Sequence, residues 1–304
     1  MQLPKQVTLK EVGPRDGLQN EKIHVETADK VQLVNLLSET GLNYIEVTSF
    51  VHPKWIPQLA DAVEVLQAIK REKNCTYAAL IPNMHGLERA LQVNIDEASV
   101  FMSASESHNQ NNINKSISET FPVVKEVVLG AKSSGKQVRG YISTVIGCPY
   151  EGYIQPDQVL RVVDQLLEMG IAEISLGDTI GVGVPTQVER LLEQLFKRYP
   201  VDKFALHFHD TRGIALANIM KSIEMGITKF DSALGGLGGC PYAKGASGNV
   251  ATEDLLYLLD GMGIHTGVDL KKVLQASTFI EQKLGKPVAS KQMAIVRNEG
   301  GAQA

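Results

Sequence analysis

The chain has 304 residues, of which 43% are hydrophobic and 21% are charged, and 30 Lys and Arg against 34 Asp and Glu give a formal net charge of −4. This near balance of charge disfavours nucleic acid as a partner, and no apolar run approaches the roughly 18 uncharged residues of a membrane span. The N-terminal sequence lacks the apolar core of a signal peptide, and three scattered cysteines are too few for a disulfide framework, so we expect a cytoplasmic protein with reduced thiols.

Short apolar runs alternate with longer amphipathic stretches along the chain. The first helix, for example, is expected to begin at Thr27, which can cap it, and to stop near Gly41. The predicted strands are 7–13, 44–49, 75–80, 97–103, 137–145, 172–177, 203–208 and 228–233. The predicted helices are 27–41, 57–70, 84–93, 117–134, 156–169, 185–198, 212–225 and 250–262, with an additional helix at about 269–284.

Eight strand-then-helix units predict an α/β fold with a parallel sheet and helices outside it. The number and length of these units favour a single catalytic domain, a closed (β/α)8 TIM barrel over about residues 7–262. We expect an additional C-terminal helical segment after the barrel and a flexible tail over about 290–304. A doubly wound open sheet is the alternative. The sequence has no GxGxxG at the first strand-to-helix turn, which weakens a dinucleotide-binding version of it.

Chemistry in such barrels occurs where strands end, and unusual polar residues occur at these positions. Arg15 and Asp16 follow the first strand within GPRDGLQNE, a segment that an ordinary surface turn would also explain. Glu46 lies inside an apolar run, where a carboxylate is costly unless paired, and we expect it to hold the guanidinium of Arg15. Asp178 closes the apolar run of the sixth predicted strand in the same way.

The seventh predicted strand carries two histidines at a spacing of two residues. His207 and His209 therefore project to the same side of the strand, which is the geometry of a pair of metal ligands. Asp210 follows, and it can cap the next helix instead of joining the site.

A long glycine-rich loop, GGLGGCPYAKGASGN, follows the eighth predicted strand. A thiol on such a loop above a barrel mouth suits an acid, a base or a nucleophile, which makes Cys240 a candidate catalytic residue; the alternative is an incidental loop thiol. Asn249 ends the loop as a candidate ligand or as an ordinary helix cap.

Asp16, His207, His209 and Asn249 together offer one carboxylate, two imidazoles and one amide oxygen. This mixed set suits Mg²⁺ or Mn²⁺ better than Zn²⁺ or Fe²⁺. A cation there can polarise a hydroxyl and a carbonyl, Arg15 can stabilise an enolate, and a thiol can protonate the resulting carbanion. These parts suit making or breaking a carbon–carbon bond next to a carbonyl.

The motifs EVGPRDGLQNE, IEVTSFVHPKWIPQ, RGYISTVIGCPYEG, EISLGDTIGVG, HFHDTRGIALAN and GLGGCPYAKGASGNVATEDL together resemble the 3-hydroxy-3-methylglutaryl-CoA lyase family over about residues 7–285. The resemblance implies cleavage of that acyl-CoA to acetyl-CoA and acetoacetate in leucine degradation. It implies a divalent cation on Asp16, His207, His209 and Asn249, Arg15 on the substrate carbonyl, Cys240 as catalytic thiol, and supporting roles for Glu46 and Asp178.

The base that removes the substrate's hydroxyl proton is expected to be Asp16 or His207, and family members suggest a homodimer. Lys22 is a candidate CoA contact. Two rival functions use the same residues: a condensing synthase or aldolase-type lyase on a related acyl-CoA, and a non-catalytic protein that keeps a metal site.

Overall fold

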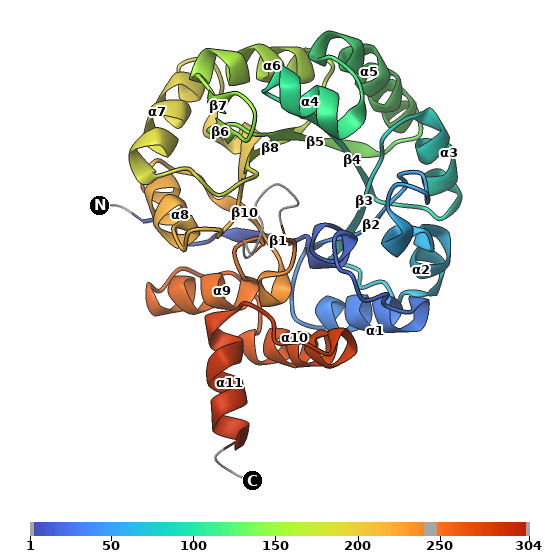
Figure 1. The fold of residues 1–304 in the computed structure, drawn as a ribbon, viewed down its shortest axis with the longest axis vertical. Coiled ribbons are helices and arrows are strands. Elements are labelled where there is room, and N and C mark those ends of the chain that lie inside the picture. Colours follow the sequence, from blue (N-terminus) through green and yellow to red (C-terminus); the bar gives the residue numbers. More distant parts are fainter. Residues whose placement is uncertain (1–2, 240–247, 302–304) are drawn as a thin grey trace.

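The computed structural model describes residues 3–239 and 248–301 of the chain. Within these residues, parallel strands close into a barrel in the order β1-β10-β9-β8-β5-β4-β3-β2, which confirms the predicted TIM barrel and excludes the open sheet (Figure 1). The barrel strands are β1 (Thr8–Glu11), β2 (Tyr44–Ser49), β3 (Thr76–Leu80), β4 (Glu97–Ser103), β5 (Gln137–Ser143), β8 (Glu173–Asp178), β9 (Phe204–Phe208) and β10 (Lys229–Ser232).

A ring of helices surrounds the barrel, and each helix buries one apolar face against it (Figure 1). In α6, for example, Val159, Val163 and Leu166 recur at helical spacing and are all buried. Pro57 begins a separate 3-10 turn, so the predicted helix 57–70 is reduced to a short α2. The ring comprises α1 (Thr27–Ser38), α2 (Ala62–Ala68), α3 (Met84–Gln92), α5 (Ile117–Ser133), α6 (Pro156–Glu168), α7 (Pro185–Phe196), α8 (Ala215–Glu224) and α9 (Thr252–Gly261).

Two short insertions follow the carboxyl ends of β4 and β5, and the sequence patterns did not predict either of them. They are the helix α4 (Glu106–Ile113) and a hairpin made of β6 (Gly147–Cys148) and β7 (Gly152–Tyr153). In Figure 1 both lie inside the ring of helices, over one end of the barrel. They therefore help to enclose the end at which the predicted site residues occur.

The C-terminal segment differs from the flexible tail expected from about residue 290. After α10 (Leu270–Leu284), residues Lys291–Gly301 form α11, which runs away from the ring in Figure 1. The carboxylate of Asp254 accepts the backbone N–H groups of Lys291 and Gln292, both at 2.9 Å, and so satisfies the start of the helix. Met293 is 1% exposed, which ties the first turn of α11 to the core.

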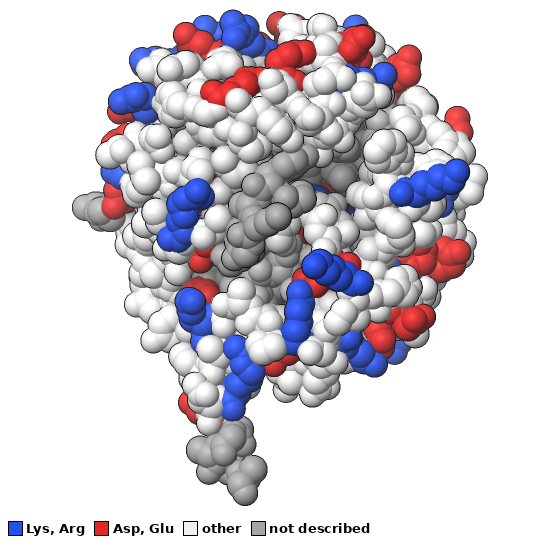
Figure 2. Space-filling model, in the orientation of Figure 1, with Lys and Arg blue, Asp and Glu red and all other residues white. Residues whose placement is uncertain are grey.

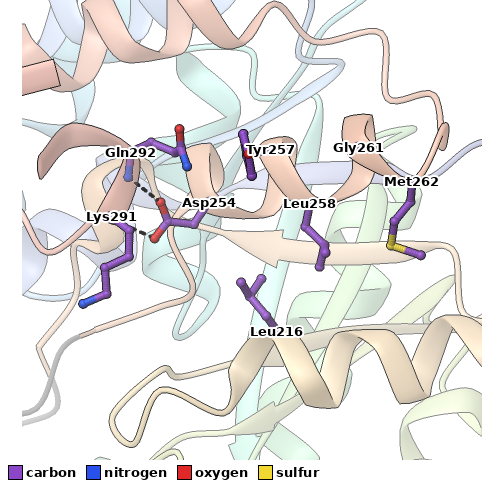
Figure 3. Close-up of a pocket in the computed structure, with 8 residues that line it drawn as sticks. All are labelled: Leu216, Asp254, Tyr257, Leu258, Gly261, Met262, Lys291 and Gln292. Carbon is purple, nitrogen blue, oxygen red and sulfur yellow. Dashed lines mark hydrogen bonds between the residues drawn. The ribbon is translucent and has the colours of Figure 1, made fainter. Parts of the chain in front are cut away.

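A surface pocket of about 410 Å³ lies between α8, α9 and the start of α11 (Figure 3). Its walls are mainly apolar and include Leu216, Leu258 and Met262. None of the residues that line it is a predicted site residue. The described part of the chain contains no helix that is both long and apolar enough to cross a membrane.

Candidate active site

Arg15 and Asp16 reach the barrel mouth through a π-helical turn, Gly13–Gly17, that directly follows β1. The carbonyl of Val12 accepts the backbone N–H groups of Arg15, Asp16 and Gly17, which curls the chain over the barrel end. A Cβ atom at Gly13 would lie 2.3 Å from Cδ2 of Leu234, so this position requires glycine. Arg15 is only 6% exposed, which excludes the alternative of an ordinary surface turn.

The guanidinium of Arg15 lies between two carboxylates. Its Nε donates to Oε2 of Glu46 at 2.5 Å, and its Nη1 donates to Oδ1 of Asp16 at 2.6 Å. The expected pairing of Arg15 with Glu46 is therefore present, and the hydroxyl of Tyr141 also donates to Oε2 of Glu46, at 3.1 Å. Burial by itself would lower the pKa of Arg15, but the charges of Glu46 and Asp16 raise it above its ordinary value. The guanidinium is thus a fixed positive charge in the barrel mouth.

Asp16, His207 and His209 bring one possible ligand atom each within 4.8 Å of one another. His207 lies in β9 and His209 directly after it, so both rings face the same side, and their centroids are 5.3 Å apart. Nε2 of His207 lies 3.8 Å from Oδ2 of Asp16. Asn249 joins them because it pairs with His209 in an isolated β-bridge, and its Nδ2 donates to Oδ2 of Asp16 at 2.8 Å.

Two polar atoms of this cluster are buried without a hydrogen-bond partner among the described residues, Nδ1 of His209 and Oδ1 of Asn249. Such atoms are costly unless something else binds them. Burial, and next the charge of His207, lower the pKa of His209 to about 4, so its imidazole is neutral at pH 7. Burial raises the pKa of Asp16, but Arg15 and His207 outweigh this and lower it to about 2. An ionised carboxylate, neutral imidazole and an amide oxygen fit a divalent cation.

Asp178 lies at the end of β8, and its carboxylate holds the loop that follows. It accepts the backbone N–H groups of Val182 at 3.2 Å and Gly183 at 2.8 Å, and burial raises its pKa. Its link to the cluster is its backbone carbonyl, which accepts the N–H of His209 at 3.4 Å. The carboxylate of Asp210 accepts the N–H of Ala215 at the start of α8, which agrees with the alternative prediction that Asp210 caps this helix.

Asp231 lies directly behind His207, and the sequence motifs did not predict a role for it. Oδ2 of Asp231 lies 3.2 Å from Nδ1 of His207, and Nη2 of Arg139 donates to Oδ1 of Asp231 at 2.6 Å. Asp231 and Arg139 are charged residues inside predicted strands, in KFDS and QVRGYIS, and a search for charged residues within strands would have found them. Cys240 lies outside the described residues.

A pocket of about 260 Å³ shares Asn249 with the cluster, and its lining also includes Thr211, Gly236 and Lys291. Figure 2 shows Lys and Arg side chains around the lower half of the same face of the molecule. Lys22 is exposed, and Nζ of Lys286 lies 2.5 Å from Oε2 of Glu21 on the neighbouring loop. Lys and Arg side chains therefore gather along this part of the rim although the chain as a whole is acidic, and Lys286 is paired there with Glu21.

Comparison with known proteins shows to which family the chain belongs. The HMGL-like family matches residues 6–280. The Bacillus subtilis protein named hydroxymethylglutaryl-CoA lyase YngG is 56% identical over 98% of this chain and 100% of its own length. A crystal structure of the Bacillus subtilis HMG-CoA lyase superposes with a TM-score of 0.96 at 56% identity, covering 98% of this chain and 100% of that one.

A second structure, an HMG-CoA lyase from Acinetobacter baumannii in complex with coenzyme A and 3-methylmalate, superposes with a TM-score of 0.90. It is 41% identical and covers 94% of each chain. Sequence identity of this extent over nearly the whole chain, together with the shared barrel and the family match, is sufficient to assign the chain to a family. The chain belongs to the hydroxymethylglutaryl-CoA lyase family, whose members are carbon–carbon lyases.

Proposed function

We propose that this lyase cleaves 3-hydroxy-3-methylglutaryl-CoA to acetyl-CoA and acetoacetate, with Mg²⁺ or Mn²⁺ held by Asp16, His207, His209 and Asn249. The observation that carries the proposal is the pair of unpartnered buried atoms, Nδ1 of His209 and Oδ1 of Asn249, beside an ionised Asp16. A bound divalent cation would supply Lewis-acid polarisation of the substrate's hydroxyl and carbonyl oxygens.

Arg15 is assigned to the substrate carbonyl. When the C3 hydroxyl loses its proton, its oxygen becomes the ketone oxygen of acetoacetate and the C2–C3 bond breaks. The electron pair of that bond moves into the enolate of acetyl-CoA, whose oxygen the guanidinium of Arg15 stabilises. Glu46 holds the guanidinium in place through its contact with Nε at 2.5 Å. A proton delivered to C2 by the thiol of Cys240 completes acetyl-CoA.

Asp16 is our choice for the base that takes the hydroxyl proton. Nδ1 of His207 contacts Asp231, and its Nε2 is the atom that faces Asp16 and His209, so neither ring nitrogen is left for a proton transfer. A carboxylate with a pKa of about 2 is a weak base. Asp16 can therefore accept the proton only from a hydroxyl that has been made acidic in the site. Asp178 supports the site by holding the loop after β8.

The CoA portion of the substrate is expected to cross the basic rim shown in Figure 2, with Lys22 as a candidate contact. This expectation rests on charge, because the phosphates of CoA are anionic and the rim is positive although the net charge is −4. The proposal also includes a homodimer, a cytoplasmic location, a role in leucine degradation, and no partnership with nucleic acid or membranes. Light scattering on the purified protein tests the dimer.

A coupled assay for acetoacetate release from 3-hydroxy-3-methylglutaryl-CoA tests the proposal, with EDTA treatment and re-addition of Mn²⁺ or Mg²⁺ as the metal control. We expect cleavage that EDTA abolishes and either cation restores. Cleavage unaffected by EDTA would contradict the metal assignment. A protein that binds Mn²⁺ without cleaving this substrate would contradict the substrate assignment and favour a condensing synthase, another lyase or a binding protein.

A further inference from the structure

Asp231 is a buried carboxylate that contacts the back of the candidate metal site instead of the site itself. It lies in β10 and is 1% exposed, and its Oδ2 is 3.2 Å from Nδ1 of His207. Arg139 donates to both oxygens of Asp231, at 2.6 Å and 3.3 Å, and the hydroxyl of Ser175 donates to Oδ2 at 2.7 Å. The carboxylate is thus held from three sides, in the barrel interior.

These contacts settle which atom donates in the bond to His207. Arg139 donates to both of its oxygens and the hydroxyl of Ser175 donates to Oδ2, and such an array of donors around one carboxylate is the environment of its ionised form. An ionised carboxylate has no proton to give, so it accepts, and Nδ1 of His207 must carry the hydrogen. In a neutral imidazole the lone pair is then on Nε2, the atom that lies 3.8 Å from Oδ2 of Asp16.

We propose that Asp231 is a positioning residue that fixes His207 as the tautomer with hydrogen on Nδ1 and so turns the Nε2 lone pair toward Asp16 and His209. The inference rests on the proposed function only in taking this cluster as the cation site. A carboxylate behind a metal-ligating histidine orients the ring and raises its basicity, and loss of such a partner weakens metal binding by about 10- to 100-fold. Arg139 keeps Asp231 ionised and fixed.

Glu173 provides a matched control, because it shares Arg139 with Asp231 and has no hydrogen bond to His207 among the described contacts. Nε of Arg139 donates to Oε1 of Glu173 at 2.7 Å, and Lys10 and Lys229 lie 2.7 Å and 2.8 Å from its two oxygens. Removing either carboxylate leaves Arg139 with one acidic partner fewer. A role limited to neutralising Arg139 would therefore make the two substitutions equivalent.

The first test compares Mn²⁺ titrations of the wild type, Asp231→Asn and Glu173→Gln. An asparagine cannot satisfy both neighbours, because its amide N–H₂ must face either Nδ1–H of His207 or the donors of Arg139. We expect the Mn²⁺ dissociation constant to rise about 10- to 100-fold in Asp231→Asn and to stay within about threefold in Glu173→Gln. Unchanged affinity in Asp231→Asn, or equal losses in both variants, would overturn the proposal.

The second test observes His207 in the wild-type protein, and a substitution serves only to assign its signals. The chain has 7 histidines, so imidazole ¹⁵N spectra of the metal-free protein are simple, and the loss of one signal set in His207→Gln assigns His207. We expect His207 as the Nδ1–H tautomer, and an Nε2–H tautomer would overturn the inference. If Asp231→Asn weakens Mn²⁺ binding while the wild type fails to cleave the substrate, the proposed reaction is wrong and the role of Asp231 stands.

Discussion

Glu253 is a fully buried carboxylate that holds the backbone where the loop after β10 begins. Both of its oxygens accept the N–H of Gly235, at 2.8 Å and 2.9 Å, and the hydroxyl of Ser277 donates to Oε1. Gly235 has φ +66°, and a Cβ there would lie 2.8 Å from Cβ of Val288, so this position requires glycine. The loop that starts here ends at Asn249, and Glu253 therefore supports one edge of the candidate site.

Burial raises the pKa of Glu253 from its ordinary 4.5 to about 7, although the bonds from Ser277 and Gly235 oppose the change. The folded protein then binds this proton more tightly than the unfolded chain does. The stabilisation is complete below pH 4.5, is lost progressively as the pH rises toward 7, and is absent above it. One pKa unit corresponds to about 1.36 kcal/mol, so the full loss is about 3 kcal/mol, and most of it falls between pH 5 and pH 8.

The substitution Glu253→Gln removes this proton equilibrium and keeps a carbonyl oxygen to accept from Gly235 and Ser277. We expect the free energy of unfolding, measured by urea titration from pH 5 to pH 8, to fall by about 2 to 3 kcal/mol more in the wild type than in the variant. Glu64→Gln, at an exposed position of α2, controls for the loss of any one carboxylate. Parallel pH profiles for the wild type and Glu253→Gln would refute the reasoning.

Three further predictions concern the reaction itself. Glu46→Gln should lower kcat at least about 10-fold with a smaller effect on KM, because Arg15 loses the carboxylate that holds its guanidinium. Steady-state kinetics at saturating Mn²⁺ measure both constants, and an unchanged kcat would contradict the prediction. His209→Ala should weaken Mn²⁺ binding in a calorimetric titration, and an unchanged titration would exclude His209 as a ligand. Cys240→Ser should cut turnover by about 100-fold or more while metal affinity stays close to wild type; full activity would exclude the thiol as the acid.

Much of the fold could be predicted because each barrel strand is a short apolar run and each ring helix has one apolar face. The predicted 97–103 and 203–208 agree with β4 and β9 to within one residue. The patterns failed where local chemistry decides the structure. Residues 106–112 are all polar, and the segment forms α4 because the side chain of Ser105 caps the helix by accepting the N–H of His108. The start of α11 is similarly capped by the carboxylate of Asp254, which is distant from it in the sequence, so the local pattern did not predict this helix.

The candidate site could be predicted in its members but not in its contacts. A pair of histidines two residues apart on a strand fixes their common direction, so the proximity of His207 and His209 follows from sequence alone. The approach of Asn249 to His209 does not, because it depends on a β-bridge formed by the end of a long loop. The buried atoms without hydrogen-bond partners, which make the cluster a candidate cation site, likewise depend on tertiary packing. The spacing of residues in the sequence cannot predict them.

The interior of this barrel joins the reacting end to a charged layer beneath it. Arg139 is completely buried and its charge is balanced by Glu173 on one side and Asp231 on the other. A buried ion pair is weak as a source of stability, because desolvation offsets most of the attraction. Replacing such a layer with apolar side chains would cost the fold little. It would, however, remove the carboxylate that contacts Nδ1 of His207, so the layer serves the geometry of the site more than the stability of the fold.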